Sequence, residues 1–226
     1  MKKLLTIIGI VACIACSGAE GDGMVPESFN KMLDNYRSAS AFSCDGDITT
    51  GAKDSQMRSQ KSFTLSFGRP DRFDLNLIET DPASQRMKTN RVFMIQGQPY
   101  SQTAPYFRTK EESSLSQALK SCRGASGGMS ELIPPLLLGT NVFDKTSIVQ
   151  QPDAQVNGIM CFHFSALTVR KQSVELFVDQ KDFAILELQR TFRIEAKQIP
   201  SNSPDLAKMA NSEFITTITC RNFKFN

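Results

Sequence analysis

The sequence has few of the residues on which metal sites and acid–base sites depend. It contains one histidine, His163, and none of the HExxH, paired CxxC or nucleophile-elbow motifs. A triad base or a metal ligand is one interpretation of His163, but its place in the strand-like "CFHF" favours a histidine on a surface or edge strand. The glycine-rich residues 123–128 lack the preceding strand and the following lysine of a phosphate-binding loop, so they indicate a hinge. We therefore expect no enzymatic activity, no metal site and no cofactor.

The aromatic residues are unevenly distributed, with 16 phenylalanines, three tyrosines and no tryptophan. Phenylalanine supplies apolar area without a hydrogen-bonding group. The charges are nearly balanced: removing Lys2 and Lys3 from the 26 basic residues leaves 24 against 23 acidic ones, a net charge of about +1. With no basic face, the chain is not expected to bind nucleic acid.

No apolar run in the chain reaches the about 20 residues that a membrane-spanning helix needs. The longest run, residues 4–15, follows two lysines and is typical of a secretory signal. We predict a signal peptide over residues 1–19 and a protein that is exported to the periplasm. Ala15-Cys16-Ser17-Gly18 also resembles a bacterial lipoprotein site, which would end the signal before Cys16 and anchor the protein to a membrane by lipidation of that residue.

Four cysteines follow the signal, and an even number in an exported chain favours two disulfides. Spacing does not choose among the three pairings, and four buried thiols are the alternative. Lipidation of Cys16 leaves this number even, whereas lipidation at the other candidate site, Cys13, would leave five cysteines. The disulfide candidates are Cys44, Cys122, Cys161 and Cys220.

The hydrophobic pattern predicts a mainly β protein with helices (α+β). Phe29, Met32, Leu33 and Tyr36 have helical spacing and predict an amphipathic helix of about 14 residues that opens at Pro26. Alternating residues then predict about five antiparallel strands, a helical insertion over residues 111–139, and about five further strands. So many one-sided strands require a cover for their apolar face, and the two helical regions are the only candidates. We predict a curved antiparallel sheet covered by the leading helix and the insertion.

Two groups of apolar side chains are candidates for binding a lipid or an acyl chain. The first alternates along two adjacent strands on either side of the corner "FGRPDRF" and forms one face of the predicted sheet. The second forms an apolar cluster beside the glycine-rich residues and would act as a lid. These residues are Phe63, Leu65, Phe67, Phe73, Leu75 and Leu77 on the sheet, and Leu132, Ile133, Leu136 and Leu137 on the lid. A sheet whose apolar face packs into a solid core, without a ligand cavity, would show the same alternation of apolar residues.

The corner "FGRPDRFDLN" resembles the bacterial lipoprotein-carrier (LolA-like) superfamily, most closely its exported relatives of unassigned role. In that family an early strand ends in Arg-Pro and the next begins one turn later, as at Arg69-Pro70 and Arg72-Phe73 here. The stretches "VNGIMCFHFSA" and "VELFVDQKDFAILELQ" also resemble strands of these proteins. Phe177 stands where relatives often have tryptophan. The likeness covers residues 25–226 and implies a single LolA-like lipid-binding domain.

The resemblance implies an unclosed half-barrel with helices as a lid and with lipids or acyl chains bound between them. By the same resemblance, Arg69 would bond to the lid helices and hold the closed form, and the alternative is a solvent-exposed arginine in the turn. The expected function is non-catalytic binding of a lipid, acyl chain or lipoprotein in the cell envelope. The alternative is an envelope sensor or protein-interaction module with the same fold, a solid core and a protein partner.

Overall fold

The computed structural model describes residues 25–53, 58–80, 84–105, 108–193 and 211–226. The predicted signal peptide and the predicted lipidation of Cys16 lie outside these residues. Within them, no helix combines the length and the apolar character needed to cross a membrane.

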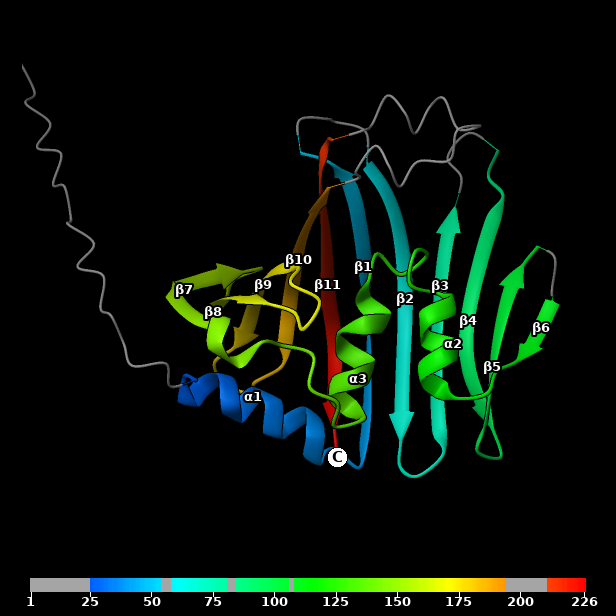
Figure 1. Ribbon diagram of the computed structural model, residues 1–226, viewed down its shortest axis with the longest axis horizontal. Helices are drawn as coiled ribbons and strands as arrows, with labels where there is room; N and C mark the ends of the chain where they lie inside the picture. The colour runs from blue at the N-terminus through cyan, green and yellow to red at the C-terminus, as the bar shows by residue number, and fades with distance from the viewer. Residues whose placement is uncertain (1–24, 54–57, 81–83, 106–107, 194–210) are drawn as a thin grey trace, which may run out of the picture.

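The described residues form one antiparallel sheet of eleven strands with helices on one side (Figure 1). The order across the sheet is β6-β5-β4-β3-β2-β1-β11-β10-β9-β8-β7, and the two edge strands do not pair with each other. The predicted class, a mainly β half-barrel that is not closed, is confirmed. The strands are β1 (Ala41–Ala52), β2 (Arg58–Gly68), β3 (Arg72–Thr80), β4 (Met87–Ile95), β5 (Gln98–Ala104), β6 (Arg108–Glu111), β7 (Val149–Val156), β8 (Ile159–Leu167), β9 (Ser173–Asp179), β10 (Ile185–Arg193) and β11 (Glu213–Phe225).

The last strand lies in the middle of the sheet, where β11 pairs with β1. Gly46 of β1 lies opposite Cys220 of β11 on one side and opposite Phe63 of β2 on the other. A Cβ atom at Gly46 would lie 2.0 Å from the carbonyl oxygen of Thr219 and 2.7 Å from the ring of Phe63. Only glycine therefore lets the Phe63 ring cover the strand at this position.

Helix α1 (Glu27–Ser38) lies across the apolar face of the sheet (Figure 1). Its residues Phe29, Met32, Leu33 and Tyr36 are at most 2% exposed, as their helical spacing predicts. The ring of Phe29 packs edge-to-face on that of Phe164, with centroids 5.2 Å apart. The hydroxyl of Tyr36 accepts a hydrogen bond of 3.1 Å from the backbone N–H of Ile185. The predicted leading helix is thus present and covers part of the sheet.

The helical insertion supplies the rest of the cover. It consists of α2 (Leu115–Ser121), the 3₁₀ turn η1 (Met129–Glu131) and α3 (Ile133–Leu137), and a second 3₁₀ turn, η2 (Lys145–Ser147), precedes β7. Pro134 and Pro135 occupy the first turn of α3, where proline is tolerated, so they begin this helix rather than break it. We call residues 115–142 the lid segment.

Two local features of the sheet are set by a turn and by a register shift. The hairpin between β4 and β5 turns at Gln96-Gly97, and Pro99 and Tyr100 belong to β5. A register shift in β10 between Ile185 and Glu187 rotates Leu186 away from the main core. Leu186 and Leu188 therefore do not share a face, because Leu186 packs in a small separate cluster with Val156 and Cys161.

Candidate functional site

The six apolar residues predicted on the sheet lie side by side on its covered face. The β2–β3 register places Phe63 opposite Leu77, Leu65 opposite Leu75, and Phe67 opposite Phe73. All six are at most 4% exposed, and the four predicted lid residues are at most 3% exposed. The ten side chains belong to one hydrophobic cluster. The lid segment therefore occupies the space in which we expected a ligand to lie.

Arg69, at the corner between β2 and β3, connects the sheet to both covering elements. Its Nε donates to the carbonyl oxygen of Ala39 at 3.0 Å, and Nη2 donates to that of Arg37 at 2.7 Å, both at the end of α1. The same Nη2 donates to the carbonyl oxygen of Leu137, the last residue of α3, at 2.8 Å. The guanidinium also lies over the ring of Phe67, 5.4 Å from its centroid. One side chain thus contacts the sheet, the leading helix and the lid segment.

The glycine-rich turn that precedes α3 lies directly against the sheet. A Cβ atom at Gly127, whose φ is +56°, would approach Thr216 Cγ2 to 2.7 Å and Ile48 Cγ2 to 3.1 Å. The ammonium group of Lys61, on β2, donates to the carbonyl oxygen of Ala125 at 3.1 Å. The glycines that we had interpreted as a hinge therefore allow a close approach of the backbone to the strands.

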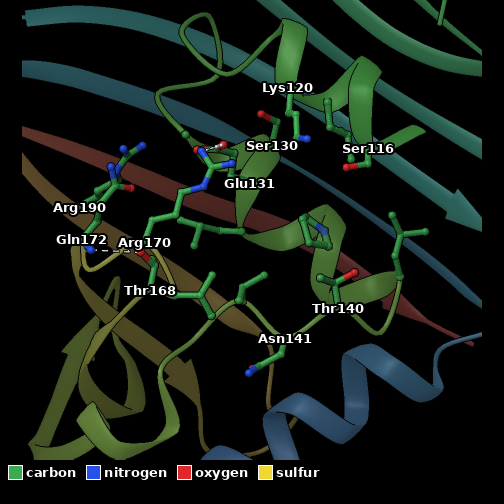
Figure 2. Close-up of a pocket in the computed structure, with 17 residues that line it drawn as sticks. Ser116, Lys120, Ser130, Glu131, Thr140, Asn141, Thr168, Arg170, Gln172 and Arg190 are labelled. Atoms are coloured by element: carbon green, nitrogen blue, oxygen red, sulfur yellow. Dashed lines mark hydrogen bonds and ion pairs between the residues drawn. The ribbon is translucent and has the colours of Figure 1, made fainter. Parts of the chain in front are cut away.

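A pocket of about 180 Å³ lies between the lid segment, the turn that joins β8 to β9, and β10 (Figure 2). Leu138 and Val169 are 39% and 55% exposed, whereas Leu132 is 3% exposed and also belongs to the core beneath the lid segment. The wall of the pocket therefore continues from surface side chains to the covered face of the sheet. Its apolar lining consists of Leu119, Leu132, Pro135, Leu138, Val142 and Val169.

The charged groups of the pocket are of both signs. Glu131 accepts from Arg123 at 2.7 Å and from Arg170 at 2.6 Å. Arg190 also lines the pocket from β10. The sequence analysis missed Arg190, although a charged residue two positions after the buried Leu188 in an alternating strand is a signal that could have identified it.

His163 is on the opposite face of its strand from Phe162 and Phe164, which pack in or against the main core. Its Nε2 lies 2.9 Å from Glu175 Oε2, and its ring stacks on that of Phe177 at 4.5 Å. The Ser165 hydroxyl donates to the same Glu175 oxygen and not to the histidine, so the three groups do not form a nucleophile–base pair. In the described part of the chain, no cluster of three or more histidine, cysteine or acidic residues could hold a metal ion.

The structure contradicts the prediction of two disulfides, because all four described cysteines are free thiols. Cys161 lies in the small separate cluster and Cys122 in the main core, so these two cannot meet. Cys44 and Cys220 are neighbours across β1 and β11. Their mutual hydrogen bond, followed by burial, raises the pKa of the Cys44 thiol well above its usual value. Burial also raises the pKa of Cys122 to about 11, so both are poor nucleophiles near neutral pH.

No protein-family model and no curated protein matches the sequence. Solved structures that match include a domain described as outer membrane lipoprotein-sorting from Vibrio parahaemolyticus, with 11% identity over 88% of this chain and 91% of that chain and a TM-score of 0.40. A LolA superfamily protein from Nitrosomonas europaea matches with 15% identity over 90% and 94% of the two chains and a TM-score of 0.37. A DUF1329 family protein from Desulfovibrio piger matches with 13% identity over 89% and 93% and a TM-score of 0.39. The LolA-like resemblance stands as a likeness of fold, and identities this low say nothing about a ligand or a partner.

Proposed function

We propose that the protein binds a lipid or an acyl chain between the covered face of the sheet and the lid segment, without catalysis. The observation that carries this proposal is the apolar pocket at the edge of the lid segment. Its lining includes Leu119, Leu132 and Val142, which also belong to the main core. A chain that enters there meets core side chains directly, and displacing them gives access to the apolar face of β2 and β3.

Energetics set the length of chain that could replace the lid. Leu132, Ile133, Leu136 and Leu137 are each buried, and at about 1.5–3 kcal/mol per side chain they contribute about 6–12 kcal/mol to closure. A methylene group contributes about 0.8 kcal/mol on burial, so an acyl chain of about 8–15 methylenes offers comparable burial. The proposed ligand is therefore a long-chain amphiphile and not a small apolar molecule.

Arg69 has a definite role in this proposal, because it holds the closed form. Its bond to the carbonyl of Leu137 must break when α3 leaves the sheet, whereas its bonds to Arg37 and Ala39 can remain. The proposed setting is the cell envelope, in lipid or lipoprotein handling. The predicted signal at residues 1–19 supports export, and Cys16 supports a membrane tether.

The second candidate is an envelope sensor or protein-interaction module with a solid core. The near-complete burial of all ten predicted ligand-facing side chains favours this candidate. In that case the lid segment never leaves the sheet, and a protein partner binds elsewhere on the domain.

Two measurements on the purified wild-type protein separate the candidates. Organic extraction followed by mass spectrometry should recover a co-purifying lipid, and a fluorescent hexadecyl probe with an uncharged head should bind saturably. A protein that yields no lipid and binds no probe would overturn the lipid-binding proposal in favour of the interaction module.

A further inference from the structure

Arg190 occupies an unusual position for a charged side chain. It is on the lid-facing side of β10, between Val174 of β9 and Thr216 of β11 in the register. The side chain is only 8% exposed. Long charged side chains are rarely buried to this extent without a partner of opposite charge.

Its hydrogen-bonding groups are largely unused within the described residues. Nη1 donates to the carbonyl oxygen of Gly127 at 3.4 Å, a long hydrogen bond, and the buried Nε has no hydrogen-bond partner. The guanidinium also lies over the ring of Phe192 at 5.6 Å, which satisfies none of its N–H groups. A buried donor without an acceptor costs about 1–3 kcal/mol, and more when the group is charged.

The carboxylate that lines the pocket, Glu131, is already engaged. Glu131 is held by Arg123 and Arg170 and is not hydrogen-bonded to Arg190 in the described structure. The pocket is therefore lined by three cationic side chains, Lys120, Arg170 and Arg190, and by one carboxylate that is twice paired. Burial, followed by the charge of Arg123, lowers the pKa of Arg190, yet an arginine remains protonated near neutral pH. The excess positive charge faces a space that a ligand could enter.

The backbone opposite Arg190 is shaped to admit the guanidinium. A Cβ atom at Gly128 would lie 1.8 Å from Nη1, and the φ of this glycine is +90°. Glycine at this position therefore leaves room for the arginine head beside the lid segment. The position of the guanidinium depends on contacts from the lid segment as well as from its own strand.

We propose that this pocket binds the anionic group, a carboxylate or a phosphate, of an amphiphile whose chain runs along Leu132, Leu138 and Val142. Arg190 is the principal binding residue, since its planar fork of donors matches either anion in a bidentate manner. A volume of about 180 Å³ is below the roughly 300–1,000 Å³ of pockets that enclose a drug-sized ligand, so it suits one end of a longer molecule. This inference rests on the proposed function and specifies the chemistry of the ligand head.

The test compares two ligands with the same chain, dodecanoate and dodecanol, by displacement of the uncharged hexadecyl probe at pH 7.5. In the wild type, dodecanoate should bind at least tenfold more tightly than dodecanol. Arg190→Gln should abolish this preference and change dodecanol binding less than twofold. Arg193→Gln is the matched control, because Arg193 is on the same strand but its side chain is 70% exposed, and it should keep the preference.

Three outcomes would contradict the inference in distinguishable ways. Equal affinities for the two ligands in the wild type, or a preference that survives in Arg190→Gln, overturn the head-group site and leave the proposed function intact. Failure of both ligands and of the probe to bind overturns the proposed function. If inorganic phosphate alone then raises the unfolding temperature of the wild type but not of Arg190→Gln, the pocket binds a free anion and the head-group assignment is wrong.

A second variant covers the case in which Arg190→Gln does not fold. The Arg170 side chain is 48% exposed and pairs with Glu131 at the surface, so Arg170→Gln should fold. It removes one of the three cations from the pocket, and the preference for dodecanoate should fall severalfold. An unchanged preference in this variant would count against the head-group site.

Discussion

Replacing Arg69 with alanine should loosen the lid segment without removing it from the protein. The substitution deletes three hydrogen bonds, and the one to Leu137 is the one that holds α3. Such a bond contributes about 0.5–1.5 kcal/mol net, and the arginine is exposed, so we take about 1 kcal/mol for the contact with α3. Because about 1.4 kcal/mol corresponds to a factor of ten, the open form should become about fivefold more populated.

Hydrogen exchange measures this opening directly. The amides of Leu136, Leu138 and Gly139 donate to the carbonyls of Leu132, Pro134 and Leu136, so they report on α3. They should exchange about fivefold faster in Arg69→Ala, since their exchange requires the lid segment to open.

Arg58→Ala is the control for the Arg69 variant, because Arg58 is an exposed arginine at the other end of the same strand. It should leave exchange in α3 unchanged. Wild-type exchange rates for α3 in Arg69→Ala would refute the role given to Arg69. If the α3 amides and those of the β2–β3 ladder accelerated by the same factor, α3 would open only with the whole domain and no lid would exist.

Other substitutions test separate parts of the structure. Leu136→Asp places a carboxylate at a fully buried position of the lid segment. It should alter the affinity for the hexadecyl probe while far-ultraviolet circular dichroism shows that the sheet stays folded. Unfolding of the whole domain would instead mean that α3 is an ordinary part of the core. Oxidation should join Cys44 to Cys220 only, so titration of the unfolded, oxidised protein without residues 1–19 should find two of its four cysteines as thiols. Finding no remaining thiol would contradict the described packing. His163→Ala should change probe affinity less than twofold, and severe loss of function in a folded variant would revive a catalytic role. Hydrogen bonds from Lys171 and Thr146 lower the pKa of Asp144 from 3.8 to about 2. The ionised carboxylate therefore stabilises the fold above its ordinary pKa, and this contribution disappears as pH falls towards about 2. Asp144→Asn should make the unfolding temperature depend less on pH over that range, and an unchanged pH profile would argue against the interaction.

The features that the sequence predicts well depend on short-range periodicity. The alternation through Phe63 and Leu65 identifies a one-sided strand, and the spacing of Phe29 and Met32 identifies the helix that covers it, because side-chain direction follows directly from backbone period. The corner at Arg69 is likewise visible as a local interruption between two alternating runs.

The features that the sequence did not reveal depend on long-range placement. In the sequence, Arg190 is one more residue of an alternating strand. Its burial becomes visible only in the structure, where it lies beside β11 and against Gly128. The prediction of two disulfides failed because strand faces decide which thiols can meet, and Cys161 lies outside the main core. A one-residue register shift moved Leu186 to the other face, as expected when a strand has a period of two.

The central position of β11 has a consequence for how the chain folds. The hydroxyls of Thr50 and Thr216 form a hydrogen bond of 2.9 Å although the two residues are 166 positions apart in the sequence. The half of the sheet that holds β1–β6 therefore joins the half that holds β7–β11 through β1 and β11, the two strands farthest apart in the sequence. Bringing such distant segments together carries a loop-closure cost in entropy before any contact compensates for it, and non-local pairing of this kind slows folding. Until β11 is in place, β1 and β10 each present an unpaired edge, and exposed edges are templates for association between chains. The chain is therefore expected to be more prone to aggregation before β11 docks than after it, and a chaperone that shields the edge of β1 would act at that step.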